Sequence, residues 1–221
     1  MDIPSIVRQL ALSALPVLIA ITFHEVSHGF IANKLGDPTA KMLGRLTLNP
    51  LAHIDLFGTI LLPLMLILFG SPFVFGYAKP VPINPMNFKN PRRDMALSAA
   101  GGPATNFLLA VASVLAIKLV TRPAVGFLPP EIVSTMLSPA DQMLQYSIFI
   151  NVALATFNLI PVPPLDGGRV VVGFLPHKQA ISFSRIEPYG FFIVILLIAT
   201  HVADYFVRPL MSLFIGLLSL L

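Results

Sequence analysis

Residues 10–28, LALSALPVLIAITFHEVSH, form an apolar run that ends in a group of ionisable side chains. No charged residue separates Arg8 from His24, so this stretch resembles a membrane-spanning helix that ends in an H-E-x-x-H motif. Ionisable groups are costly at membrane depth and are functional by default. On a helix, His24 and His28 share one face and can bind one metal ion, and Glu25 can reach a water molecule on that ion as general base. The motif predicts a zinc peptidase site within the bilayer.

The composition indicates an integral membrane protein. Of the 221 residues, 56% are hydrophobic and 11% are charged, whereas a soluble domain carries about 25% charged residues. The net charge of +4 indicates loops that face anionic lipid and does not favour nucleic-acid binding. The chain has no cysteine, so a metal site must use His, Asp or Glu ligands.

Apolar segments recur along the whole chain and predict an all-α fold. We expect a polytopic transmembrane helical bundle of about five to six spans, with kinked or broken helices around a metal site. Pro16 is expected to kink the first segment, and Gly36-Asp37-Pro38 to end it. The last segment could be one span with a surface helix, or two short spans. The expected segments are residues 5–35, 57–78, 95–117, 142–165 and 188–221.

The chain is expected to form a single membrane-embedded domain over residues 1–221. Its catalytic core would cover residues 5–170, and the apolar region 188–221 would follow it. The loops are too short to hold a soluble regulatory domain. The basic cluster Lys89, Arg92 and Arg93 is expected to contact lipid headgroups.

A catalytic zinc ion usually takes three protein ligands, and the first segment supplies two. The sequence leaves Asp166, His53, Asp55, His201 and Asp204 as candidates for the third. Asp166 is favoured because it follows a stretch with three prolines, NLIPVPPLDGG at residues 158–168. Broken backbone at membrane depth is tolerated where it is buried in protein or lines a wet cavity, and an acid at such a break favours a cation.

The combination of H-E-x-x-H with N-x-x-P-x-P-P-L-D-G resembles the site-2 protease family of intramembrane zinc metalloproteases. The resemblance covers residues 20–170. It includes Gly101-Gly102-Pro103-Ala104-Thr105-Asn106, which is similar to a G-P-x-x-N element of that family. Residues 49–59, NPLAHIDLFGT, resemble the compact branch that lacks PDZ or CBS domains.

This resemblance implies a role for each matching residue. His24, His28 and Asp166 would bind one Zn²⁺ ion per chain, and Glu25 would be the catalytic base. Asn158 would place substrate or the oxyanion, and Asn106 would lie near the site and bind substrate backbone. The substrate would be a membrane protein with a transmembrane helix, in the lipid bilayer of a prokaryotic cytoplasmic membrane.

Several alternatives remain open at this stage. His53 and Asp55 could support the active site or make structural hydrogen bonds, and Gly101-Gly102 could serve close helix packing alone. His201 and Asp204 are expected at a membrane interface. The competing function is a membrane metal-binding or metal-transport protein that uses the His/His/Asp site, although the chain lacks the internal repeat typical of transporters. The oligomeric state and membrane orientation are left open.

Overall fold

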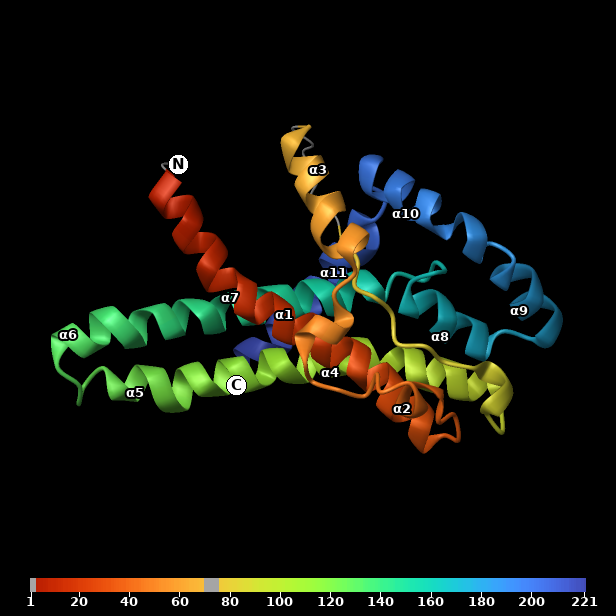
Figure 1. Ribbon diagram of the computed structural model, residues 1–221, viewed down its shortest axis with the longest axis horizontal. Helices are drawn as coiled ribbons and strands as arrows, with labels where there is room; N and C mark the ends of the chain where they lie inside the picture. The colour runs from red at the N-terminus through yellow and green to blue at the C-terminus, as the bar shows by residue number, and fades with distance from the viewer. Residues whose placement is uncertain (1–2, 70–75) are drawn as a thin grey trace.

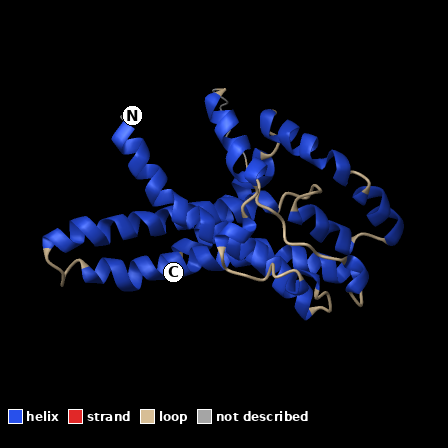
Figure 2. Ribbon diagram, viewed as in Figure 1, coloured by secondary structure: helices blue, strands red, loops and turns tan. Residues whose placement is uncertain are grey.

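The computed structural model describes residues 3–69 and 76–221, and all the regular structure in these ranges is helical (Figure 2). The long helices are α1 (Ile3–Lys34), α4 (Pro91–Ala116), α7 (Ser138–Asn158) and α11 (Asp204–Ser219). The shorter helices are α2 (Thr39–Met42), α3 (Leu62–Leu68), α5 (Arg122–Ala124), α6 (Pro130–Ile132), α8 (Asp166–Phe174), α9 (His177–Ser184) and α10 (Gly190–Ala199). Single tighter or wider turns are η1 (Pro50–His53), η2 (Leu56–Leu61), η3 (Pro85–Asn87), η4 (Ile117–Thr121), η5 (Val133–Leu137) and η6 (Glu187–Tyr189).

Helix α4 is the centre of the bundle. It packs against α1, α7 and α8, and α11 packs against α7 and α4 (Figure 1). Ala110 of α4 and Val152 of α7 are buried together with Leu218 of α11. The rings of Phe107 and Phe214 lie 4.8 Å apart beside them. Ala110 is the small residue of this cluster and lets the neighbouring helices approach α4 closely.

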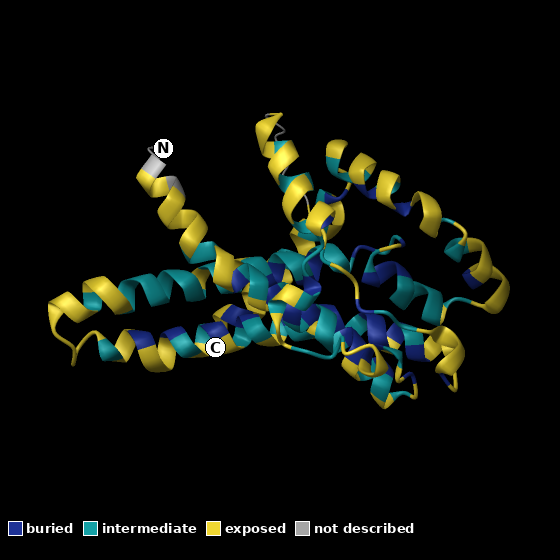
Figure 3. Ribbon diagram, in the orientation of Figure 1, coloured by how far each residue is buried: buried dark blue, intermediate teal, exposed yellow. Residues whose placement is uncertain are grey.

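Several helices project from this centre. The first turns of α1, helix α3, the α5–α6 end and the α9–α10 arm extend away from it (Figure 1), and their surfaces are largely exposed (Figure 3). Large apolar side chains account for much of that exposure, as in Phe192 (70%) and Leu196 (61%) of α10. Water disfavours so much exposed apolar surface, whereas lipid does not.

By length and apolar composition, three helical stretches of the described chain are able to cross a membrane: Val7–Lys34, Pro91–Ala124 and His177–Ala199. The apolar stretch Leu56–Leu68 is shorter. Helix α7 is 21 residues long, yet it mixes polar with apolar residues. These findings agree with a membrane protein.

The predicted segments correspond to helices with partly different bounds. The first ends at Lys34, before Gly36, as expected. The second, 57–78, is helical to Leu68 in the described residues; residues 70–75 lie outside them, and the chain has no regular secondary structure over residues 76–84. The fourth, 142–165, leaves the helix after Asn158 because the prolines that follow cannot continue it.

The last predicted segment, 188–221, is divided into α10 and α11. The division falls at His201, whose φ of 58° is left-handed. Two helices joined by a turn therefore make up this segment, as both expected arrangements, a span with a surface helix or two short spans, require.

The turn after α1 is fastened by a buried carboxylate. Asp37 is fully buried and accepts hydrogen bonds from the backbone N–H of Thr39 (3.1 Å) and of Asn84 (2.7 Å). The Thr39 hydroxyl and the Asn87 side-chain amide also donate to it. Burial alone would raise the pKa of Asp37, but these donors outweigh it and hold the pKa below its ordinary value. Asp37 thereby ties the end of α1 to residues 84–87.

We predict that Asp37→Asn destabilises the protein by about 2–3 kcal/mol, because the NH₂ group of the new amide would face hydrogen-bond donors whose bonds the carboxylate now accepts. Since the folded pKa is depressed, the stabilisation is present above the pKa of the unfolded carboxyl group and is lost as the pH falls through the folded value. The gap in melting temperature between wild type and variant, measured in detergent, should therefore narrow below about pH 4. A gap that stays constant down to pH 2 would contradict this account.

Candidate metal centre

Three side chains from two distant parts of the chain meet inside the bundle. His24 and His28 lie one turn apart on α1, and Asp166 is the first residue of α8. Asp166 Oδ2 lies 3.1 Å from His24 Nε2 and 3.3 Å from His28 Nε2, and the two Nε2 atoms are 3.1 Å apart. Each of the three residues is less than a tenth exposed. Within the described residues, this is the group of three that could hold a metal ion.

The partners of the two rings show which nitrogens carry hydrogen. His28 Nδ1 lies 2.8 Å from the Ser98 carbonyl oxygen, which can only accept a hydrogen bond. His24 Nδ1 faces Asn106 Oδ1, which is also an acceptor. Both Nδ1 atoms therefore donate, and in the neutral rings both Nε2 atoms present lone pairs. Two lone pairs and a carboxylate oxygen cannot hydrogen-bond one another, so the arrangement fits a cation.

Helix α4 supplies the wall behind the two imidazoles. Ser98, Gly102 and Asn106 recur every four residues and so share one face. The Ser98 hydroxyl donates to the His28 carbonyl oxygen at 2.8 Å, which completes a reciprocal pair. A Cβ at Gly102 would lie 2.5 Å from Cε1 of both imidazoles and from His28 Nε2. Glycine at this position allows α4 to reach the rings.

A compact turn places Asp166. Residues 159–165 leave the helical path, with a cis peptide bond between Pro163 and Pro164. A Cβ at Gly167 would meet the carbonyl oxygens of Leu159 and Ile160, and one at Gly168 would meet Val162 and Pro163 backbone atoms. Hence α8 begins directly against the turn, and its N-terminal dipole favours the Asp166 carboxylate.

Glu25 is held by a segment that the sequence analysis placed partly in a span. The backbone N–H of Val81 donates to Glu25 Oε2 at 2.9 Å. Val81 belongs to a stretch without regular secondary structure, residues 76–84, in which Pro80 and Pro82 prevent helix formation. The group that holds Glu25 is a backbone N–H, which no side chain in the sequence identifies. The two prolines of this stretch, Pro80 and Pro82, were the available signal.

His53 and Asp55 lie in the loop that supports this stretch. The His53 carbonyl oxygen accepts from Lys79 N at 2.9 Å, and the His53 ring lies 2.9 Å from Thr47 O. Asp55 accepts from Gly58 N at 2.7 Å, and Gly58 O in turn accepts from Tyr77 N at 3.0 Å. Both residues are thus joined to Glu25 through the backbone of residues 77–81.

The remaining candidates have separate positions. Asn106 is fully buried beside His24. The side-chain amide of Asn158 donates to Leu154 O within α7 at 2.9 Å. At the start of α11, His201 Nδ1 lies 3.6 Å from Asp204 Oδ2, and Arg208 forms an ion pair with the same carboxylate. Of the five candidates for the third ligand, the structure brings Asp166 to His24 and His28. Among the described residues, the other four candidates lie outside this cluster: His53, Asp55, His201 and Asp204.

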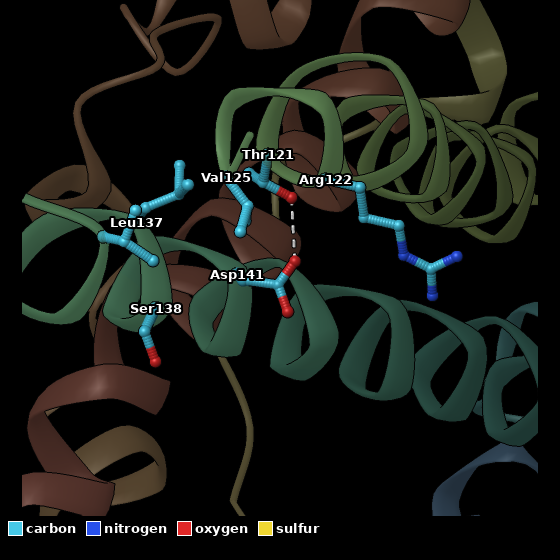
Figure 4. Close-up of a pocket in the computed structure, with 7 residues that line it drawn as sticks. Thr121, Arg122, Val125, Leu137, Ser138 and Asp141 are labelled. Atoms are coloured by element: carbon cyan, nitrogen blue, oxygen red, sulfur yellow. Dashed lines mark hydrogen bonds between the residues drawn. The ribbon is translucent and has the colours of Figure 1, made fainter. Parts of the chain in front are cut away.

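A cavity of about 230 Å³ lies elsewhere, between the η4–α5 segment on one side and η5 with the first turn of α7 on the other. There the Thr121 hydroxyl donates to Asp141 at 2.8 Å, beside Arg122 (Figure 4). None of its lining residues belongs to the metal cluster, so this cavity is separate from the candidate centre.

Known proteins are similar to this chain over most of its length. Residues 12–200 match the model of peptidase family M50. "Putative zinc metalloprotease YwhC" of Bacillus subtilis is 37% identical over 196 residues, which cover 89% of this chain and 84% of the relative. "Putative zinc metalloprotease Rip2" of Mycolicibacterium smegmatis is 27% identical over 83% of this chain and 64% of its own length. No solved structure matches the chain.

The tight approach at Gly102 generates a prediction. Gly102→Ala should reduce bound zinc at least about tenfold, because the new methyl group displaces the imidazoles that present the lone pairs. Alanine favours a helix by about 1 kcal/mol over glycine, so a general loss of folding is not expected. Zinc in purified protein can be measured by atomic emission. Gly216→Ala is the matched control, because its Cβ would have no neighbour within 4 Å; equal zinc in both variants would refute the steric explanation.

Proposed function

Since the chain belongs to peptidase family M50, the site-2 protease family, and is a zinc metalloprotease, we propose that it cleaves peptide bonds within or near transmembrane helices of other membrane proteins. The observation that carries this proposal is the convergence of three acceptor atoms beside Glu25 in a bundle with an apolar exterior. The protein would be a multi-pass protein of a prokaryotic cytoplasmic membrane, with about five to six spans.

We assign His24, His28 and Asp166 as the ligands of one zinc ion per chain. Two imidazole nitrogens and one carboxylate oxygen are a ligand set that zinc accepts in catalytic sites, and three protein ligands leave a position for water. Bound there, zinc would polarise the scissile carbonyl and lower the pKa of water. The Nδ1 hydrogen bonds of both rings would fix their orientation.

Glu25 is proposed as the general base. It follows His24 directly on α1, and the Val81 N–H holds its Oε2. Oε1 is the oxygen that we assign to proton transfer, first from water and then to the leaving amine. The carboxylate needs a fixed rotamer for this task, and the hydrogen bond from the Val81 N–H supplies one.

The substrate helix must open before it can be cut. In a bilayer, the backbone of a helix satisfies its own hydrogen bonds and hides its carbonyl groups. Substrates with helix-weakening residues near the cleavage site should therefore be preferred. Asn158 follows the apolar part of α7 and remains a candidate for binding the unwound backbone.

The test is cleavage of a tagged transmembrane substrate by purified protein in detergent. Glu25→Gln should lower kcat about 10²–10⁴-fold and keep its zinc, because the base is not a ligand. Asp166→Ala should lose both zinc and cleavage. Zinc flux in liposomes that accompanies an inactive wild type would favour the transport alternative.

A further inference from the structure

Asn151 is buried in the bundle and belongs to none of the motifs in the sequence. It lies on α7 with no exposed surface, and its partner across the helix interface is the equally buried Asn106 of α4. Asn106 Nδ2 donates to Asn151 Oδ1 at 2.8 Å. Because Asn106 faces His24, Asn151 is one amide removed from a proposed metal ligand.

The orientation of the Asn106 amide determines what His24 can do. Its Nδ2 has two acceptors, Asn151 Oδ1 and the Ala20 carbonyl oxygen at 3.1 Å. Its Oδ1 therefore points to His24 and can only accept a hydrogen bond. A flipped amide would place an oxygen against two other oxygens and a donor against His24 Nδ1.

We propose that Asn151 is a positioning residue that selects the metal-binding tautomer of His24 by fixing the Asn106 amide. This inference rests on the proposed role of His24 as a ligand. With the amide as observed, Nδ1 of His24 carries the hydrogen and Nε2 carries the lone pair. With the amide flipped, the hydrogen moves to Nε2, and that nitrogen no longer binds a metal ion.

Asn151 is itself held in one orientation. Its Nδ2 donates to the Ser147 carbonyl oxygen at 2.8 Å and lies 3.2 Å from the Ser147 hydroxyl. That hydroxyl is 2.8 Å from Ser113 Oγ on α4. Because the Ser147 carbonyl can only accept, the Asn151 amide must present Oδ1 to Asn106. The constraint thus runs from the α7 backbone through two amides to α1.

Burial makes this chain of contacts consequential. Neither amide is exposed, so bulk water does not replace a missing partner at either position. Without Asn151, only the Ala20 carbonyl opposes the flip, and the hydrogen bond to it is the longer of the two. A larger share of molecules than in wild type would then hold His24 in the tautomer with hydrogen on Nε2, which cannot bind zinc through that nitrogen.

The experiment compares Asn151→Ala with Thr156→Val in detergent. Thr156 is a matched control because it is equally buried on α7 and its hydroxyl donates to the Val152 and Ala153 carbonyl oxygens of its own helix. Zinc affinity is measured by competition with a chromophoric chelator. Asn151→Ala should weaken zinc binding about 10- to 100-fold, and Thr156→Val should leave it unchanged. At saturating zinc, KM for the transmembrane substrate should stay as in wild type.

A second background distinguishes tautomer selection from loss of packing. In Asn106→Asp, both side-chain oxygens accept, so a flip changes nothing. In that background Asn151→Ala should not weaken zinc binding, because it removes an oxygen that faces the new carboxylate and leaves the acceptor opposite His24 Nδ1 in place. The same loss of zinc affinity in both backgrounds would overturn the proposal. If Asn151→Ala does not fold, Asn151→Ser is measured in both backgrounds with the same two outcomes.

Failure of the inference is separable from failure of the proposed function. If His28→Ala and Asp166→Ala each bind zinc with the affinity of wild type, the ligand assignment is refuted, and the inference with it. Zinc binding that requires both residues but is unaffected by Asn151→Ala would overturn the inference alone.

Discussion

Three acceptor atoms that face one another across about 3 Å are the constraint on which the rest of the structure depends. Placed together without a cation, the lone pairs of His24, His28 and Asp166 repel, and in a bundle with little water nothing screens them. The surrounding protein holds them there. Helix α1 fixes two of the atoms by the spacing of one turn, and α8 begins against a tight proline turn that aims the third.

Helix α4 converts this cluster into a defined geometry. Its Ser98, Gly102 and Asn106 lie on one face and meet His28, both imidazoles and His24 in turn. A side chain at position 102 would push α4 away from α1. A hydrogen-bond donor in place of the Ser98 carbonyl or of Asn106 Oδ1 would favour the imidazole tautomer that carries its hydrogen on Nε2. The packing of α4 against the two imidazoles and the tautomers of these rings are therefore set by the same four-residue spacing, in keeping with the position of α4 at the centre of the bundle.

The sequence predicted the parts of this site that have a local pattern. The spacing of His24 and His28 needs only a helix, and Asp166 was favoured because prolines break the chain before it. The contacts of Glu25 and Asn106 were not predictable in this way. Glu25 is bound by the Val81 backbone, 56 residues away, and Asn106 by Asn151 on another helix. Such contacts appear only after the helices are packed, and a backbone donor leaves no mark in the sequence. The second predicted segment, 57–78, corresponds in the described residues to a shorter apolar helical stretch, Leu56–Leu68, and residues 76–78 have no regular secondary structure.

Charge balance connects the ligand set to its surroundings. With zinc bound as proposed, the divalent ion would be matched by two carboxylates, Asp166 as ligand and Glu25 as base, while both imidazoles stay neutral. The centre would then carry no net charge at a depth where an unpaired charge is costly. A third histidine in place of Asp166 would leave one positive charge uncompensated. An aspartate as the third ligand therefore suits an apolar bundle better than it would suit a solvated cleft, where water and counter-ions screen the excess.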